Sequence, residues 1–157
     1  KLARTEFFFL AESRGRTEVI LGDGRLSLER ERGQQYDLLV VDAFSGDSIP
    51  VHLLTMQALE LYFHHLRPTG ILALHITNTH LDLAPVVDTL TRKLGKHAVM
   101  ITNDRDEDRE IYTATWALIS SRPLTSPAIQ EAAEELPHRP ELRPWTDDYN
   151  NLFQILK

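Results

Sequence analysis

Two aspartates in the segment YDLLVVDAFSGDSIP, residues 36–50, have the clearest chemical potential in the chain. Asp42 directly follows the apolar run 38–41, which is typical of a buried parallel strand. Asp47 comes next, in a loop that contains Gly, Ser and Pro. Ligands of open α/β sheets bind outside the carboxyl ends of the strands, so two carboxylates there could hold a cation or take a proton from an amine. Alternatively, Asp42 only turns the chain, because Asp is common after strands.

Three other polar clusters follow predicted strands or close the chain. Gly22-Asp23-Gly24 is either a tight turn or a loop that reads the edge of a purine through Asp23 and backbone N–H groups. Asn78 begins the polar stretch after an apolar strand, where ordinary loop polarity is the alternative. The segment 145–150, WTDDYN, combines acids with aromatic rings and suits an ammonium ion. The same segment could instead be a helix start with acids near the N-terminus.

Composition excludes several classes of function. The 157 residues carry a net charge of −6, which disfavours binding to a phosphate backbone, so no nucleic-acid partner is expected. The chain has no cysteine, and its seven histidines lack zinc-binding spacing, so no metal is expected. No G-x-S-x-G elbow of an α/β hydrolase occurs. No apolar run reaches the roughly 18 residues that span a bilayer, and a cytoplasmic location is expected.

Strand-like and helix-like segments alternate along the chain. The patterns predict strands at 17–21, 37–42, 70–77, 97–102 and 112–119, and helices at 25–32, after Thr55, at 84–95 and at 127–136. The charged segment 103–110 is expected to be a solvated connection. Alternation of this kind predicts one α/β domain, residues 1–157, with a mostly parallel sheet covered on both faces. Because the chain starts without Met, it is expected to be a piece of a longer product.

The order of these motifs resembles the spermidine synthase-like proteins. The resemblance rests on GDGR at 22–25, YDLLVVDAFSGDSIPVHLLT at 36–55, GILALHITN at 70–78 and PWTDDYNN at 144–151. It is strongest to a bacterial branch in which this domain is often fused to membrane segments. The resemblance implies a Rossmann-like fold of the S-adenosylmethionine-dependent methyltransferase type. It also implies aminopropyl transfer from decarboxylated S-adenosylmethionine to a polyamine such as putrescine.

The resemblance also implies roles for single residues. Asp23 and Gly24 match the pair that contacts the adenine, and Asp42, which is also expected at the co-substrate, matches the first acid of the family's D-[ST]-[ST]-D-P loop. Asp47 is the candidate for the second acid, the proton acceptor, although four residues rather than two separate it from Asp42. Ser48 beside it is expected at the substrate.

The other residues expected to bind the substrate lie later in the chain. They are Asn78 after the strand at 70–77, and Trp145, Asp148 and Tyr149 in the C-terminal motif.

One family feature is missing from the sequence. No G-x-G-x-x-G-type loop occurs in the sequence. The family carries one on its first two strands, which lie in the sheet between the strands that match 17–21 and 37–42. The sheet is therefore expected to have a gap beside strand 37–42. Another segment or chain could fill the gap, most simply in a homo-oligomer, or the flanking strands could rearrange.

Three functions remain open at this point. The first is an aminopropyltransferase, and the second is a methyltransferase that uses S-adenosylmethionine as co-substrate. The third is a non-catalytic module that binds a partner or a polyamine.

Overall fold

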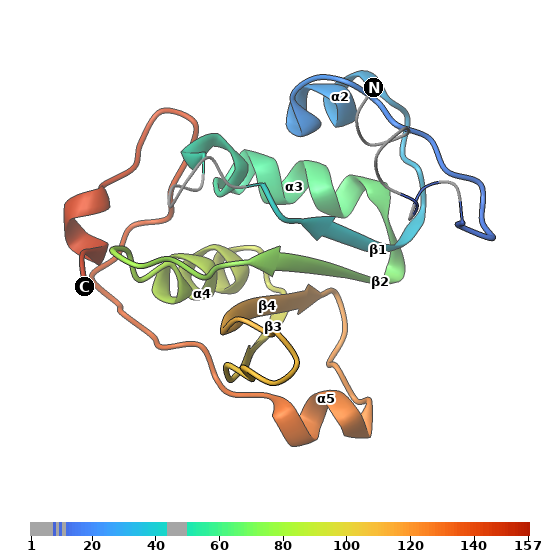
Figure 1. The fold of residues 1–157 in the computed structure, drawn as a ribbon. Coiled ribbons are helices and arrows are strands. Elements are labelled where there is room, and N and C mark those ends of the chain that lie inside the picture. Colours follow the sequence, from blue (N-terminus) through green and yellow to red (C-terminus); the bar gives the residue numbers. More distant parts are fainter. Residues whose placement is uncertain (1–7, 9, 11, 44–49) are drawn as a thin grey trace.

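The computed structural model of the chain describes residues 8, 10, 12–43 and 50–157. Its helices are α2 (Gly24–Arg30), α3 (Met56–His65), α4 (Ala84–Lys93) and α5 (Pro127–Ala132). Its strands are β1 (Tyr36–Val41), β2 (Leu66–His75), β3 (His97–Asn103) and β4 (Ala114–Ser120), and two short 3-10 helices lie at Val51–Leu53 and Leu152–Ile155. Figure 1 shows α2 and α3 side by side at one side of the sheet, with α5 far from both.

The four strands form one sheet in the order β1-β2-β4-β3. β1 pairs with β2 in parallel, whereas β4 runs antiparallel to both of its neighbours, β2 and β3. Three strands therefore share one direction and β4 opposes them. The predicted α/β fold is confirmed, and the sheet is mostly but not strictly parallel.

Helices α3 and α4 bury the same face of the sheet. Leu59 of α3 and Leu90 of α4 are fully buried in a cluster that includes Leu72 and Leu74 of β2. Full burial of a leucine side chain contributes roughly 1.5–3 kcal/mol, so this layer holds the sheet and the two helices together.

The opposite face is open at β1. Leu38 is 55% exposed and Val40 is 50% exposed, while Leu39 and Val41, which alternate with them, pack against the core. The prediction that helices cover both faces of the sheet is therefore wrong at this strand.

Local sequence signals explain where two of the helices begin. The Thr55 hydroxyl accepts a hydrogen bond from the backbone N–H of Ala58 and caps α3, as predicted. Asp23 caps α2 in the same way, through the N–H of Leu26. Among the described residues, no helix is both long and apolar enough to cross a membrane.

The predicted strand at 17–21 does not form. Its residues have no ladder partner, and Ile20 and Leu21 are 58% and 91% exposed. A strand forms only when its backbone pairs with a neighbour, and β1, the nearest candidate, pairs with β2 alone. The alternative in which these two segments rearrange into a pair is therefore not seen.

An irregularity at the start of β2 sets the register of the parallel pair. Tyr36 lies opposite Leu66, but Leu38 lies opposite Ile71, so β2 carries extra residues between the two pairings. Gly70 lies in this bulge, where a Cβ atom would come within 2.8 Å of the Tyr36 carbonyl oxygen. Glycine permits this close approach of the two backbones.

Candidate functional site

A cavity of about 730 Å³ opens between the segment 18–31 and β1. Its volume is in the range of small-molecule sites. Asp23, Gly24 and Asp42 all line it, together with Tyr62 of α3. The three residues expected to contact an adenosine-type group therefore share one cavity, although they come from two separate segments.

Two hydrogen bonds hold the Asp23 carboxylate at the N-terminus of α2. One carboxylate oxygen accepts from the Leu26 backbone N–H at 2.9 Å, and the other lies 2.9 Å from His52 Nε2. The Leu26 N–H, and then His52, lower the pKa of Asp23. The capping role of this residue is thus observed, and its contact with a purine remains a prediction.

Asp42 meets a histidine that the sequence analysis did not single out. Its Oδ1 lies 2.8 Å from His75 Nδ1, and His75 Nε2 lies 2.7 Å from the Thr77 hydroxyl oxygen. Val41 pairs with Leu74, so the residues that follow them in the parallel strands are neighbours. The Asp42 side chain is 53% exposed and the His75 side chain 19%.

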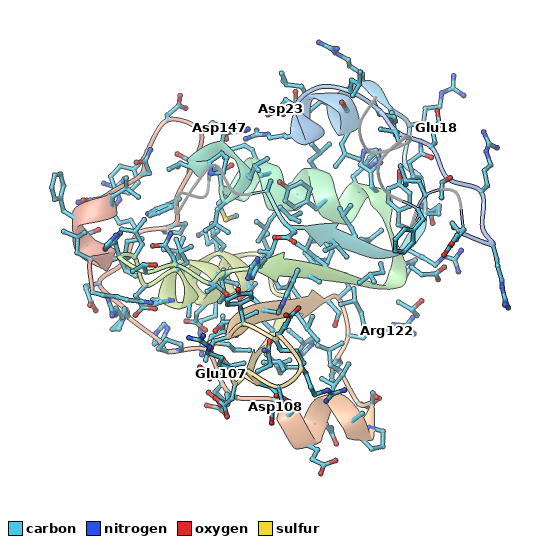
Figure 2. The ribbon with its side chains drawn as sticks, viewed as in Figure 1. Glu18, Asp23, Glu107, Asp108, Arg122 and Asp147 are labelled. Carbon is cyan, nitrogen blue, oxygen red and sulfur yellow. The ribbon has the colours of Figure 1, made fainter. Side chains whose placement is uncertain are left out.

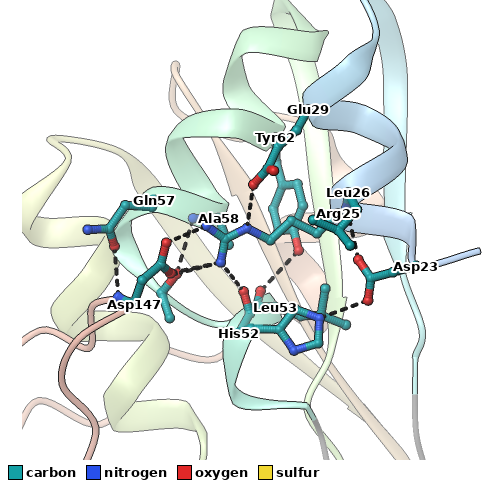
Figure 3. A network of polar contacts seen from close by, with 11 residues as sticks. Asp23, Arg25, Leu26, Glu29, His52, Leu53, Gln57, Ala58, Tyr62 and Asp147 are labelled. Carbon is teal, nitrogen blue, oxygen red and sulfur yellow. Dashed lines mark hydrogen bonds and ion pairs between the residues drawn. The ribbon is translucent and has the colours of Figure 1, made fainter.

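A second polar network joins α2 to the C-terminal motif (Figure 3). The Arg25 guanidinium makes a bidentate contact with Asp147, at 2.8 Å for Nη1–Oδ1 and 2.5 Å for Nη2–Oδ2. Arg25 Nη1 also donates to the His52 carbonyl oxygen at 2.6 Å. The Thr55 hydroxyl donates to Asp147 Oδ1 at 2.7 Å, which ties the cap of α3 into the same network.

Electrostatics in this network stabilise the charged state of both partners. The hydrogen bonds from Arg25 lower the pKa of Asp147, and those to Asp147 raise the pKa of Arg25. Arg25 is 9% exposed, so its charge requires carboxylate partners, which are Asp147 and, at 3.2 Å from Nε, Glu29. Asp147 therefore links α2 to the cap of α3.

The expected substrate residues of the C-terminal motif have structural partners. Trp145 is 2% exposed and lies in the hydrophobic core, so its ring is inaccessible. The Tyr149 ring lies under the guanidinium of Arg143, 4.4 Å from its centroid. Asp148 is exposed. The predicted role of these three residues in binding an ammonium ion is therefore weakest for Trp145.

Asn78 closes the turn after β2. Its side-chain oxygen accepts from the backbone N–H groups of His80 and Leu81, at 2.9 and 2.8 Å. The residue is 7% exposed, which fits a turn-forming role. A role in substrate binding stays a prediction. Asp47 and Ser48, the other two predicted site residues, lie outside the described residues.

Sequence reasoning missed Arg25 and His75. No residue of β2 was predicted to be functional, because a polar residue within an apolar strand is usually a packing residue. A signal did exist, since parallel pairing of two strands that both end in polar residues brings their last side chains together. No local signal connects Arg25 with Asp147, because they are 122 positions apart.

The acidic loop between β3 and β4 lies far from Asp23 and Asp147. Figure 2 shows Asp23 and Asp147 on one side of the molecule and Glu107 and Asp108 on the other. The loop is largely exposed, as expected of a solvated connection. Within the described part of the chain, no group of three or more His, Cys, Asp or Glu side chains is arranged to hold a metal ion.

The known proteins that the chain resembles include one curated enzyme and two solved structures. Over 76 residues the chain is 34% identical to the polyamine aminopropyltransferase of Vibrio vulnificus, a match that covers 47% of this chain and 25% of that protein. A probable spermidine synthase from Corynebacterium glutamicum superposes with a TM-score of 0.59 at 18% identity, over 83% of this chain and 48% of that one. MNMC2 from Aquifex aeolicus gives a TM-score of 0.48 at 21% identity, over 76% of this chain and 37% of that one. No family model matches the chain.

The resemblance to spermidine synthase-like proteins is thereby confirmed. The chain shares the Rossmann-like, methyltransferase-type fold of the Corynebacterium structure. It matches a quarter of the length of the Vibrio enzyme and about half of the Corynebacterium chain.

Proposed function

We propose that the chain is part of a spermidine synthase-like transferase that moves an aminopropyl group from decarboxylated S-adenosylmethionine to a polyamine such as putrescine. One observation carries the proposal: Asp23 and Asp42, the two acids that the resemblance assigns to the co-substrate, line the same cavity. The similarity to an enzyme named polyamine aminopropyltransferase supports the same chemistry.

The reaction is a direct displacement. The acceptor nitrogen attacks the aminopropyl carbon that is bonded to the sulfonium, the carbon–sulfur bond breaks, and a neutral thioether leaves with the bonding electrons. The attacking amine must first lose a proton, which a carboxylate, Asp47 or Asp42, accepts. A second carboxylate pairs with the distal ammonium of the acceptor. Since the sulfonium is already a good leaving group, positioning of the two substrates supplies most of the rate.

Product analysis tests this proposal directly. The complete protein is incubated with decarboxylated S-adenosylmethionine and putrescine, and mass spectrometry follows spermidine and methylthioadenosine. Appearance of both in equal amounts supports the proposal. A methylated amine, formed only when S-adenosylmethionine is the donor, would assign the protein to the methyltransferases instead.

A non-catalytic binding module is the second candidate, because two observations favour it. The sequence has no glycine-rich G-x-G-x-x-G loop, and the cavity borders the open strand β1. The present chain should then bind S-adenosylmethionine and methylthioadenosine weakly or not at all. Calorimetry with both compounds is the test, and micromolar affinity would show that residues 1–157 suffice for the adenosine pocket.

A further inference from the structure

A row of side chains crosses three strands at the carboxyl end of β1 and β2. Asp42 follows β1 and lies beside His75, the last residue of β2. His75 in turn pairs with Trp116 of β4 across the antiparallel ladder. The row lies on the sheet face opposite α3 and α4, because Leu74 and Ala117, the next residues along β2 and β4, point into the core.

Hydrogen bonding fixes the orientation of the imidazole. An ionised carboxylate only accepts hydrogen bonds, so the contact between Asp42 Oδ1 and His75 Nδ1 requires a proton on Nδ1. Thr77 holds the other end of the ring, with its hydroxyl 2.7 Å from Nε2. That hydroxyl oxygen also accepts from the Thr115 backbone N–H at 2.7 Å, so the backbone of β4 holds Thr77 in place.

Aromatic packing restrains the same ring from its face. The Trp116 indole stacks on His75 with centroids 4.6 Å apart and an angle of 15° between the planes. Two hydrogen bonds thus hold the imidazole within its plane, and the Trp116 indole packs against its face. A histidine so restrained presents the Nδ1 proton at a fixed point.

Asp42 lines the cavity, whereas His75 does not. Among the residues that the structure describes, His75 is the hydrogen-bond partner of the Asp42 carboxylate. The carboxylate is half exposed, so without this partner its side chain could exchange between rotamers.

We propose that His75 is a positioning residue, which fixes the Asp42 carboxylate at the cavity wall and leaves its second oxygen for a ligand. Only the chemistry of that ligand rests on the proposed function. The ligand would be a cationic amine, or the hydroxyl or amine groups of an adenosine. His75 touches no ligand itself and acts through Asp42.

The first test needs no ligand. Three-bond NMR couplings report whether Asp42 occupies one χ1 rotamer or averages over several. One rotamer is expected in the wild type, and averaging is expected in His75→Leu. His75→Asn should restore the single rotamer, because its amide nitrogen can take the place of Nδ1, whereas His75→Gln should not. The matched control is His97→Leu, which removes an exposed histidine at the other end of the sheet.

The second test measures ligand affinity in the complete protein. Calorimetry with methylthioadenosine and with spermidine should show about tenfold weaker binding in His75→Leu and recovery in His75→Asn, as for loss of one hydrogen bond to a charged group. An unchanged Asp42 rotamer in both His75→Leu and His75→Gln overturns the proposal. A rotamer that responds as expected, in a protein that binds neither compound, upholds the positioning role and rejects the proposed function instead.

Discussion

Arg25 and Asp147 face each other through two hydrogen bonds, of 2.8 and 2.5 Å, although 122 positions separate them. Arg25 follows the GDG turn and lines the cavity, while Asp147 belongs to the C-terminal WTDD segment. The pair therefore connects the wall of the cavity to the end of the chain. Two motifs that the family resemblance assigns to ligands are here also parts of one structural contact.

Substitution of Asp147 should destabilise the fold. Asp147→Asn removes the bidentate carboxylate partner of the buried Arg25 and leaves the longer contact with Glu29, at 3.2 Å. We expect a loss of about 1–3 kcal/mol, reduced below the buried-pair value because the Asp147 side chain is 39% exposed. Urea unfolding measures the change. The control is the exposed neighbour in Asp148→Asn, which should change the free energy of unfolding by less than about 0.5 kcal/mol. Equal effects of the two substitutions would contradict a special role for the pair.

Acidification should lower the free energy of unfolding, because the carboxylates of Asp23 and Asp147 become protonated. Both carboxyl groups have a lowered pKa in the folded chain, whereas an unfolded aspartate titrates near 3.9. Such groups stabilise the fold above the unfolded pKa, and this contribution is lost as the pH falls through the folded pKa. The free energy of unfolding should therefore decrease below about pH 4. Unfolding curves between pH 7 and pH 2.5 test this, and Asp147→Asn should show a shallower decrease. A parallel decrease in both proteins would remove Asp147 from the explanation.

The two acids after β1 should differ in their effect on turnover. If Asp47 is the proton acceptor, Asp47→Asn in the complete protein should lower turnover by roughly 10²–10⁴-fold with the fold intact. Steady-state kinetics with circular dichroism as the folding control would show this. Unchanged turnover in Asp47→Asn would move the role to Asp42, whose substitution would then show the large loss.

The open edge of the sheet should support self-association. β1 presents Leu38 and Val40 to solvent, and its backbone pairs on one side only. Such an edge is a template for pairing with another chain, so we expect a dimer or larger assembly.

Sedimentation equilibrium at tens of micromolar decides this expectation. Val40→Lys should shift the equilibrium towards the monomer, because a charged side chain blocks pairing at the edge. Phe153→Lys is the control, since Phe153 is 87% exposed but lies outside the sheet. A monomeric wild type would contradict the expectation.

The elements with a local signal could be predicted from the sequence. Hydrophobic spacing after Thr55 predicted α3 and its cap, and apolar runs located β1, β2 and β3 within a few residues. The prediction of a strand at 17–21 was wrong because β-propensity is local, whereas strand formation depends on a partner elsewhere in the fold. The reversed direction of β4 has no local signal either, because alternation of side chains looks the same in both directions.

The candidate site was predictable only in part. Asp23, Gly24 and Asp42 meet in one cavity because each follows or flanks an element that the sequence reveals. Trp145 was placed at the substrate because acids and aromatic rings combine in its segment, but its burial depends on long-range packing that this local pattern does not encode. His75 required the register of β1 against β2, which the bulge before Ile71 determines.

The bulge has a further consequence for how the chain tolerates change in length. Between Leu66 and Ile71, β2 already carries residues without a partner in β1. Loss or gain of one residue there would change only the size of the bulge. From Ile71 to His75 every residue is paired with β4, and Ile71 to Leu74 are also paired with β1, so a single insertion would reverse the parity of all side chains beyond it. His75 would then turn into the core and leave Asp42 alone. A change in length at the start of β2 therefore leaves the site intact, whereas a change in its last five residues alters which side chains face the site.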